Sequence, residues 1–590
     1  MRILYDCRKP QYKNPSGTLL PGEFCVFSIR IPTEIRTRQA DLIFRCDRTG
    51  RERTVPLDLT ERKDGYDLWR GEISFDEPDL FFYWFSITTE HERFRLFRQG
   101  DGDTNMEAGD LWQLSCVSDR YPAPDWARGA VLYQIFPDRF CREGTCDCRD
   151  KLRPYTVYER ETDPVIWRPD EKGTVWNNDF YGGNLRGIAS KLDYLRSLGV
   201  GVVYLNPIFM AYSTHRYDTC DYKRVDPMLG TEEDFADLCR QAHDRGIRII
   251  LDGVFSHTGS NSVYFDREGI FGHGAYSDPD SPYRSWYTFQ HYPDRYTSWW
   301  GFPTLPCVDK TNESYVNYII EDEDSVVAHW IRLGADGFRL DVVDELPDAF
   351  VARLRRRLRQ LKPDALLLGE VWEDASNKVA YGHRRRYFVD GELDGVMNYP
   401  WRTAILRFCR GEDDGTALRA AVETIAEHYP ADVLACSMTL AGSHDVARAL
   451  TELAAPFSGS REAMAAHRLT AEQRAVGLRR LRLAAVLQYA LPGMPSIYYG
   501  DEAGMEGCKD PFNRAFYPWG REDEPLREFY RDLGRRRNAD DALRWGSVEV
   551  TKAGCGAVTI VRRWNGKETE ITVNVREEFW IWNGERYEAG

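Results

Sequence analysis

Residues 231–252, TEEDFADLCRQAHDRGIRIILD, place an amphipathic pattern directly before a short apolar run. Thr231 is a residue type that caps helix N-termini and Gly246 one that ends helices, so the spacing predicts a helix over residues 231–245. The following run, residues 247–252, is rich in isoleucine and ends in Asp252, which predicts a buried strand. A helix that leads into a buried strand is the repeating unit of a parallel α/β fold.

Seven further segments have the character of this strand. Together the candidates are residues 131–136, 201–206, 247–252, 337–341, 365–370, 395–398, 437–440 and 496–499. Eight such strands that alternate with helices predict a closed (β/α)8 TIM barrel, whose active site lies at the carboxyl ends of the strands. The intervals 136–201 and 252–337 are too long for simple crossovers and are expected to carry lobes on that rim. An inserted lobe after strand three is placed at about residues 258–312.

The two ends of the chain show a different pattern. Short alternating or aromatic runs between turn residues occupy residues 24–31, 42–46, 80–88, 557–562, 570–575 and 579–582. They predict β modules, and Trp69 and Trp84 indicate that the first is a packed sandwich. The expected organisation is an N-terminal β-sandwich (residues 1–120), a catalytic barrel (125–540) and a small C-terminal β domain (541–590). A proline-containing connector, residues 121–125, separates the first two.

The overall charge limits the classes of partner. The 590 residues hold 78 Lys and Arg against 93 Asp and Glu, and the resulting net charge of −15 disfavours nucleic acid and anionic membranes. The sequence shows neither a secretory apolar segment nor a run of about 20 apolar residues, so we expect a cytoplasmic protein without a membrane anchor. The 14 scattered cysteines fit reduced thiols, and the spacing of Cys141, Cys146 and Cys148 is not that of a zinc site. Two arginine runs, residues 355–357 and 535–537, lie in helix-like segments and are interpreted as solvated helix faces.

Ionisable and aromatic residues gather at the ends of the predicted strands. They are Tyr217 after strand two, Asp252 and His257 at strand three, Arg339 and Asp341 at strand four, Glu370 and Trp372 at strand five, and His444 and Asp445 after strand seven. Any one of them has an ordinary structural explanation, such as a helix cap. Their convergence on one rim predicts a site, because carboxylates crowd together where a substrate and its developing charge require them.

Two carboxylates on neighbouring strands suit glycoside hydrolysis. Asp341 is predicted to attack the anomeric carbon and Glu370 to protonate the leaving oxygen, with retained configuration if the two lie about 5–5.5 Å apart. Arg339 is expected to keep the pKa of Asp341 low, whereas drier and more negative surroundings raise the pKa of Glu370. Asp445 is expected to hold sugar hydroxyls, and Tyr217 to offer a stacking face. A metal would also explain the carboxylates, but Arg339 favours an ionised nucleophile over a divalent cation.

These segments resemble the α-amylase family of retaining glycosidases (glycoside hydrolase family 13), and within it the neopullulanase, cyclomaltodextrinase and maltogenic amylase group. The resemblance extends over about residues 130–520. Besides the strand-end segments it includes VLYQIFPDRF at 131–140, YGGNL at 181–185, NPIF at 206–209, HRYD at 215–218 and YGDE at 499–502.

The resemblance implies roles for individual residues. Asp341 would be the nucleophile, Glu370 the general acid/base and Asp445 the transition-state stabiliser. The implied substrate-binding residues are Tyr217, His257, Arg339, Glu345, Trp372 and His444, with Glu345 near the acceptor side and Asp252 as a structural carboxylate beneath the subsite. The resemblance also implies a homodimer formed through the N-terminal domain.

Three segments depart from the family pattern. Ser256 stands where the family usually has Asn, and residues 305–309, LPCVD, follow the group's proline-leucine-asparagine segment loosely. The segment after Phe140 offers Cys141, Arg142 and Glu143 in place of an Asn/Asp-rich calcium loop. The loop after Phe140 therefore does not support a calcium site, no cofactor is predicted, and calcium dependence stays open.

The prediction is a retaining glycoside hydrolase that cleaves α-1,4-glucosidic bonds in maltooligosaccharides, cyclodextrins, pullulan or starch, with transglycosylation as a second outcome. An α-1,6-acting glucosidase or a glucanotransferase of the same family stays open as the alternative, since loop shape decides between them. A non-catalytic glucan-binding protein is disfavoured because all three carboxylates are present. A metal hydrolase on the barrel rim is the remaining alternative, and activity that is insensitive to chelation would argue against it.

Overall fold

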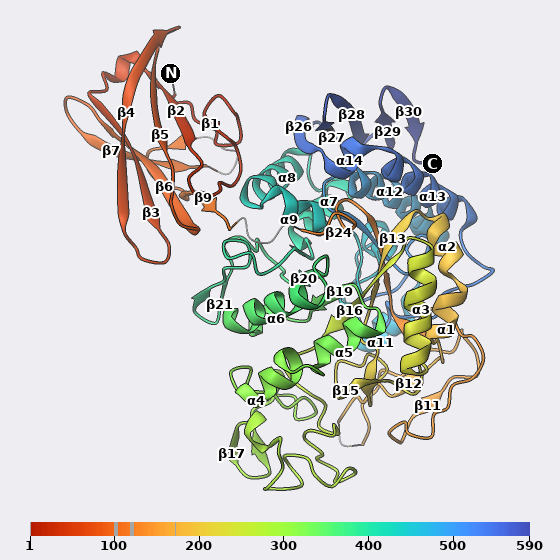
Figure 1. Cartoon of the computed structure of the whole chain (residues 1–590). Coiled ribbons are helices and arrows are strands. Elements are labelled where there is room, and N and C mark those ends of the chain that lie inside the picture. Colours follow the sequence, from red (N-terminus) through yellow and green to blue (C-terminus); the bar gives the residue numbers. More distant parts are fainter. Residues whose placement is uncertain (1, 100–103, 119–122, 172) are drawn as a thin grey trace. The chain divides into compact units, whose positions relative to one another are not determined.

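The computed structural model describes residues 2–99, 104–118, 123–171 and 173–590 (Figure 1). Residues 121 and 122 of the expected connector lie outside the described residues. The contacts divide the chain into two compact units. The first contains Met1–Pro122, Asp374–Asp394 and Thr416–Leu434, and the second contains Ala123–Glu373, Gly395–Gly415 and Ala435–Gly590.

Eight parallel strands form the centre of the second unit. They are β10 (Val131–Ile135), β13 (Val200–Leu205), β16 (Arg248–Gly253), β19 (Gly337–Leu340), β20 (Leu366–Gly369), β23 (Gly395–Val396), β24 (Met438–Leu440) and β25 (Met494–Tyr498). Their order is β23-β20-β19-β16-β13-β10-β25-β24, and a parallel bridge between Met397 and Met438 joins the two ends. The predicted (β/α)8 barrel is therefore confirmed, with each strand near its predicted position.

The helix of residues 231–245 shows how local sequence positions a barrel strand. It is α3 (Glu232–Asp244), and it begins with a capping box in which Thr231 accepts from the backbone N–H of Asp234 and Asp234 accepts from that of Thr231. Such a cap contributes about 1 kcal/mol. Gly246 follows the helix with a φ of +74°, a conformation that is unfavourable for residues with a Cβ atom. The chain then turns directly into β16.

The other helices of the second unit connect these strands or follow them. They are α1 (Leu185–Ser190), α2 (Leu192–Ser197), α5 (Val326–Leu333), α6 (Asp348–Leu361), α7 (Tyr399–Cys409), α10 (Ala449–Ala454), α11 (Arg461–Ala466), α12 (Ala471–Ala490), α13 (Glu524–Ala539) and α14 (Asp541–Trp545), while α9 (Ala431–Cys436) contains a boundary between the units. The expectation that the arginine runs are solvated helix faces is wrong for Arg355 and Arg537, which are buried. Arg537 donates to four backbone carbonyls, among them those of Gly129 and Gly493. A local helical pattern does not reveal which face will be packed.

Two long insertions extend from the barrel. The one after β10 contains η2 (Pro137–Arg139), β11 (Thr156–Val157) and β12 (Asp179–Phe180), and β14 (Phe209–Ala211) pairs with β15 (Thr219–Val225) after β13. The lobe after β16 contains η3 (Arg284–Trp286), β17 (Phe289–His291), β18 (Arg295–Tyr296), η4 (Trp299–Gly301), α4 (Glu313–Val316) and a π-helical turn, η5 (Asn317–Glu321). An antiparallel bridge between His257 and Cys307 ties the end of the lobe to the segment that leaves β16.

The first unit contains an antiparallel sheet, drawn in red and orange in Figure 1. Its strands are β1 (Lys13–Asn14), β2 (Cys25–Pro32), β3 (Gln39–Cys46), β4 (Glu52–Lys63), β5 (Tyr66–Ile73), β6 (Asp79–Thr88), β7 (Arg93–Arg98), β8 (Thr104–Asn105) and β9 (Trp112–Cys116), with η1 (Thr33–Ile35) after β2. The long strand β4 pairs with β3 through its first half and with β5 through its second half. One sheet thus contributes strands to both sides of a single core.

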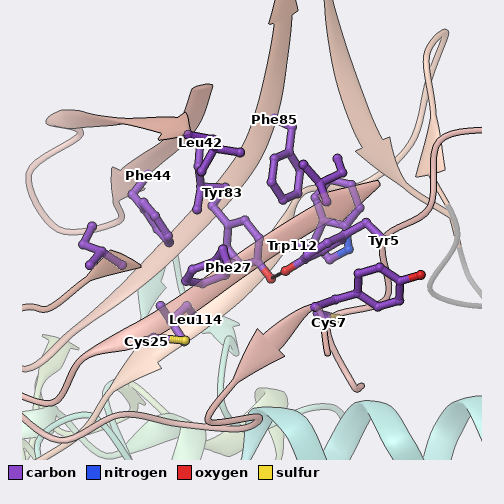
Figure 2. Packing of buried hydrophobic residues seen from close by; sticks show 14 of the residues in the cluster. Tyr5, Cys7, Cys25, Phe27, Leu42, Phe44, Tyr83, Phe85, Trp112 and Leu114 are labelled. Atoms are coloured by element: carbon purple, nitrogen blue, oxygen red, sulfur yellow. Dashed lines mark hydrogen bonds between the residues drawn. The ribbon is translucent and has the colours of Figure 1, made fainter. Parts of the chain in front are cut away.

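Aromatic side chains fill the core of this sheet (Figure 2). The ring of Phe27 on β2 lies 5.5 Å from that of Phe44 on β3 and 5.3 Å from that of Tyr83 on β6. The hydroxyls of Tyr5 and Tyr83 are 2.8 Å apart, so these buried polar groups satisfy each other. The sheet therefore has an interior of its own, as the sequence predicts for a β module.

Two later segments complete the first unit. They contain β21 (Val379–Ala380), β22 (His383–Arg384) and α8 (Thr416–His428). The Lys13 ammonium lies 3.2 Å from the Glu427 carboxylate, and both side chains are buried. The Cys7 thiol donates to the same carboxylate at 3.0 Å. A buried ion pair therefore joins α8 to the start of the chain.

The chain ends in a five-stranded antiparallel sheet, as predicted. Its strands are β26 (Ser547–Gly554), β27 (Ala557–Trp564), β28 (Lys567–Asn574), β29 (Phe579–Trp582) and β30 (Glu585–Glu588), paired in sequence order. Across the described part of the chain, no helix has the length and apolar character needed to cross a bilayer.

Candidate active site

The barrel register brings the strand-end charges together. Arg339 on β19 pairs directly with Asp252 on β16. Because side chains alternate along a strand, Arg339 and Asp341 point to the same side. The backbone N–H of Asp341 donates to Gly253, and that of Glu370 donates to Leu340, so the ladder extends just past the ends of the strands. The sheet itself therefore positions these residues.

Arg339 lies at the centre of three carboxylates. Its Nη1 is 2.9 Å from Asp252 Oδ1 and 2.9 Å from Asp341 Oδ1, and its Nη2 is 2.8 Å from Glu370 Oε2. All four residues are buried. The group carries more negative than positive charge in a dry setting, which favours retention of a proton among the carboxylates.

Arg339 lowers the pKa of Asp341 as expected, but the net shift of that pKa is upward. Burial raises the pKa of Asp341 well above its usual value, and Glu370 raises it further, although Arg339 opposes both effects. Burial likewise raises the pKa of Asp252 against the influence of Arg339. One guanidinium does not offset the desolvation and mutual repulsion of three carboxylates.

Glu370 is held by two donors from opposite directions. Its Oε2 accepts from the backbone N–H of Val342 at 2.9 Å, and its Oε1 accepts from the Trp372 indole at 3.1 Å. Val342 has a φ of +41°, which is strained for a β-branched residue and costs about 1–3 kcal/mol. The Trp372 ring stacks on Tyr399 with centroids 3.8 Å apart. Strain and stacking thus fix the orientation of this carboxyl group.

A hydrogen-bonded chain supports the floor of the site. Gln134 on β10 donates to Nδ1 of His444 at 2.8 Å, and Nε2 of His444 lies 2.5 Å from the Tyr217 hydroxyl. That hydroxyl donates to Asp252 at 2.7 Å, and Tyr204 on β13 donates to the same Asp252 oxygen at 2.6 Å. Burial lowers the pKa of His444 well below its usual value, so the ring is neutral, with Nδ1 as acceptor and Nε2–H as donor.

Asp445 stands at the edge of this floor. One of its oxygens lies 3.3 Å from Nε2 of His444 and 3.9 Å from the Arg514 guanidinium, and its side chain is 28% exposed. Burial raises its pKa to about 7, and Glu370 contributes in the same direction. The predicted third carboxylate therefore lies in the same electrostatic group as the first two and keeps access to solvent.

His257 lies at the side of the site. Its Nδ1 is 2.9 Å from the Ser256 hydroxyl, and its Nε2 is 3.1 Å from the carbonyl oxygen of Tyr217. Burial lowers its pKa to about 4, so the ring is neutral at neutral pH. Both ring nitrogens are engaged, and the Ser256 hydroxyl at the position that departs from the family pattern fills one of those contacts.

Glu345 contacts the lobe that follows β16. It ends the short helix η6 (Val343–Glu345), four residues beyond Asp341. Its Oε1 accepts from the indole of Trp299 at 3.1 Å and from that of Trp300 at 3.0 Å. The structure thus shows two indoles at the carboxylate that the resemblance assigned to substrate.

Several residues of the site were not predicted from the sequence. They are Gln134, Tyr204, Asn206, Trp299, Trp300, Tyr399 and Arg514. Gln134 and Tyr204 carry a usable signal, because each is a polar side chain within an otherwise apolar barrel strand. The two indoles lie in an irregular loop that no strand-end rule covers.

The segment after Phe140 does not fit a cation site. The side chain of Asn184 donates to the carbonyl of Glu143 at 3.0 Å, and Arg186 donates to the carbonyl of Thr145 at 2.6 Å. Side-chain donors thus occupy oxygens that calcium would need, and a guanidinium repels a cation. Within the residues that the structure covers, no three or more His, Cys, Asp and Glu side chains are arranged to hold a metal ion.

Comparisons with known proteins agree with this geometry. The model of the alpha-amylase catalytic domain matches residues 134–578. An amylopullulanase of Thermoanaerobacter thermohydrosulfuricus is 35% identical over 96% of this chain and 41% of its own length. Neopullulanase 2 of Thermoactinomyces vulgaris is 32% identical over 78% of this chain and 72% of its own. The type III pullulan hydrolase from Thermococcus kodakarensis superposes with a TM-score of 0.67 at 27% identity, over 98% of this chain and 94% of that one. The chain spans less than half the length of the amylopullulanases that it matches.

Proposed function

Because the chain belongs to the alpha-amylase family of glycoside hydrolases, we propose that it cleaves α-1,4-glucosidic bonds with retention of configuration. The observation that carries this proposal is the contact of one guanidinium, that of Arg339, with both Asp341 and Glu370. Two carboxylates on adjacent sides of one planar group suit the short separation of a retaining pair, about 5–5.5 Å, better than the wider spacing of an inverting pair.

Asp341 is the nucleophile in this mechanism and Glu370 is the acid. Asp341 attacks the anomeric carbon and forms a glycosyl ester, while Glu370 gives its proton to the departing oxygen. The crowded group retains a proton, and the positive charge that develops on the sugar beside Asp341 favours the arrangement in which Asp341 is ionised and Glu370 carries that proton. Glu370 then takes a proton from water, whose oxygen attacks the anomeric carbon and releases Asp341.

The remaining residues of the site bind the sugar. Asp445 is partly exposed and accepts hydrogen bonds from the hydroxyls of the sugar ring as the ring flattens toward an oxocarbenium ion. The Tyr217 ring lies parallel to that of His444, with centroids 5.5 Å apart, and the assembly offers one aromatic wall. Asp252 stays beneath, where two tyrosine hydroxyls and Arg339 occupy its oxygens.

The proposed substrates are maltooligosaccharides, cyclodextrins, pullulan and starch. Two relatives support pullulan and cyclodextrins as substrates: the chain is 32% identical to a neopullulanase and 28% identical to a cyclomaltodextrinase. The purified protein is to be incubated separately with maltotriose, β-cyclodextrin and pullulan, and the products separated. Panose from pullulan is the expected result, because it shows α-1,4 cleavage. Maltotriose from pullulan would instead support the α-1,6-acting alternative, and no product from any substrate would contradict the proposal.

The reaction is proposed to need no metal and no cofactor. The two carboxylates supply the nucleophile and the proton, and the segment after Phe140 is held by the side chains of Asn184 and Arg186. Unchanged hydrolysis after dialysis against a chelator is the expected result. Loss of activity that calcium restores would contradict it.

A homodimer and a cytoplasmic location complete the proposal. Leu20 and Phe24, just before β2, are large apolar side chains left exposed on the first unit, and burial of both against a second copy would stabilise a dimer. A cytoplasmic enzyme would act on short imported glucans. Gel filtration of the full chain is expected to give twice the monomer mass, and fractionation of the source cells is expected to place the activity in the cytoplasm. A monomer, or activity outside the cell, would contradict the respective part.

A further inference from the structure

A tight loop on the rim exposes an indole at an energetic cost. Trp300 lies in η4 (Trp299–Gly301), its side chain is 75% exposed, and its φ is +49°. A left-handed conformation is unfavourable for a residue with a Cβ, by about 1–2 kcal/mol. An exposed indole also forgoes the burial that normally stabilises it. Strain and exposure at one residue indicate a conformation that its surroundings impose.

The loop is fixed at its base and at its tip. At the base, Ser298 forms an antiparallel bridge with Pro306, and Thr258 donates to the carbonyl of Pro306 at 3.0 Å. At the tip, Glu345 accepts from the indoles of Trp299 and Trp300. The loop therefore connects the segment after β16 with the segment after β19, and both of its indoles donate to the same carboxylate oxygen.

The two indoles differ in what covers them. The Trp299 ring lies 5.5 Å from the ring of His257 and stacks against Phe302 with centroids 6.2 Å apart. Trp300 touches the edge of this group, with its centroid 6.0 Å from that of Trp299, and keeps most of its surface in solvent. Trp300 is thus the open face of an aromatic cluster whose inner members are packed.

The position of Glu345 indicates which part of a substrate contacts the exposed ring of Trp300. Its helix η6 starts directly after Val342, whose N–H donates to Glu370. Glu370, as the proposed acid, protonates the oxygen of the departing sugar, so the departing sugar lies on its side of the bond. The floor residues around His444 contact Asp252 through Tyr217 instead, and hold the attacked sugar.

We propose that Trp299 and Trp300 form a stacking platform for the departing sugar ring, and that Glu345 is a positioning residue that holds both indoles rather than a direct sugar ligand. This inference rests on the proposed function. The platform acts again in the reverse direction: a sugar acceptor that stacks there gives its hydroxyl proton to Glu370, its oxygen bonds to the anomeric carbon, and the carboxylate of Asp341 leaves. A filled platform favours this transfer over attack by water, because it places the acceptor oxygen at the reaction centre.

The test uses two substrates that have different departing groups but transfer the same maltosyl group when maltopentaose is cleaved after its second glucose. Maltopentaose releases a sugar that reaches the platform, whereas α-maltosyl fluoride releases fluoride, which does not. Trp300→Ala is expected to lower kcat/KM for maltopentaose about tenfold, mainly through KM, and to leave α-maltosyl fluoride within about twofold of the unaltered protein. With maltose added as acceptor, the same variant is expected to give less transfer product per molecule hydrolysed.

Glu345 is tested by a matched pair of variants. Glu345→Gln keeps an oxygen that accepts from both indoles and is expected to behave like the unaltered protein, whereas Glu345→Leu is expected to behave like Trp300→Ala. Trp564→Ala, which removes an exposed indole from β27 in the C-terminal sheet, is the control and should leave kcat/KM for both substrates unchanged. Activity on the fluoride also shows that each variant is folded.

Three results would overturn the inference. Equal losses on both substrates would show that Trp300 supports the reaction centre and not the departing sugar. An equal fall for Glu345→Gln and Glu345→Leu would show that the charge of Glu345 contacts sugar directly. Failure of the unaltered protein to hydrolyse α-maltosyl fluoride would remove the proposed function, and the platform with it.

Discussion

Two buried ion groups in this protein have opposite charge balances. In the first unit, Lys13 forms an ion pair with Glu427, and although burial raises the pKa of Glu427, the ammonium and other nearby groups lower it below its usual value. In the barrel, Arg339 is shared by three carboxylates, and burial raises the pKa of Asp341 against the guanidinium.

The difference separates a structural ion pair from a reactive one. A one-to-one pair is stable when both charges are present and becomes costly when one is removed. A group with more carboxylates than cations is destabilising in the empty protein. It is stabilised when a substrate brings developing positive charge. The direction of the carboxylate pKa shift distinguishes the two cases.

The largest expected effect comes from the nucleophile in the surplus group. Asp341→Asn is expected to lower kcat by at least about 10³-fold, because the amide cannot form the glycosyl ester. The melting temperature of the variant should be no lower than that of the unaltered protein, because the substitution removes one negative charge from a group that has an excess of carboxylates. Reducing-sugar release from maltotriose and a thermal melt measure the two quantities. Turnover within a factor of about ten would contradict the assigned role.

Removing one partner of the Lys13–Glu427 pair should lower the stability of the protein and leave catalysis unchanged. Lys13→Met leaves Glu427 buried without its partner and is expected to lower the free energy of unfolding of the first unit by about 3–5 kcal/mol. The combined variant Lys13→Met/Glu427→Leu should recover most of that loss. Urea unfolding measures the stability, and kcat of the folded protein is expected to stay the same. A single variant as stable as the unaltered chain would show that the pair is not structural.

The pH dependence of stability sharpens the comparison further. The pKa of Asp445 is about 7 in the folded protein and about 3.9 in an unfolded chain, so the folded state binds this proton more tightly. Its contribution to stability is complete below pH about 4 and is lost as the pH rises through about 7. Asp445→Asn is therefore expected to match the unaltered protein at pH 4 and to exceed it by about 2–4 kcal/mol at pH 8. Melting curves over this range measure the difference, and parallel curves would contradict the raised pKa.

The smallest expected effect is that of chelation. If Arg186 and Asn184 hold the segment after Phe140, excess EDTA should change kcat by less than a factor of about two. The melting temperature should change by less than about two degrees. Replacement of Arg186 by Met should loosen this segment and lower the melting temperature more than chelation does. A larger effect of EDTA on the unaltered protein would show that a cation is present.

The barrel strands were predictable because their signal is local. A strand covered on both faces is mostly apolar, and four of the six residues 247–252 are Ile or Leu. The capping residue Thr231 and the left-handed Gly246 are equally local signals for the helix that precedes this strand. The paired halves of β4 were not predictable, since one continuous strand shared between two neighbours leaves no mark in its own sequence. The burial of Arg537 was missed for the same reason, because the four carbonyls that it binds come from other segments.

The residues of the candidate site likewise divide into those that the sequence predicted and those that it did not. Asp252, Asp341 and Glu370 were found because a parallel barrel gathers the ends of its strands, so position in sequence implies proximity. Trp299 and Trp300 were missed, and the indole contacts of Glu345 with them, since a loop of the inserted lobe reaches a residue more than forty positions away along the chain.

The sequence by itself determined which segments become strands and which side chains stand at their ends, because both follow from patterns within a few residues. Only the tertiary structure decided how the charges are shared, that Arg339 serves three carboxylates and Lys13 one, and hence in which direction each pKa moves. Burial and through-space distance set those shifts, and neither is a property of neighbouring residues in the chain.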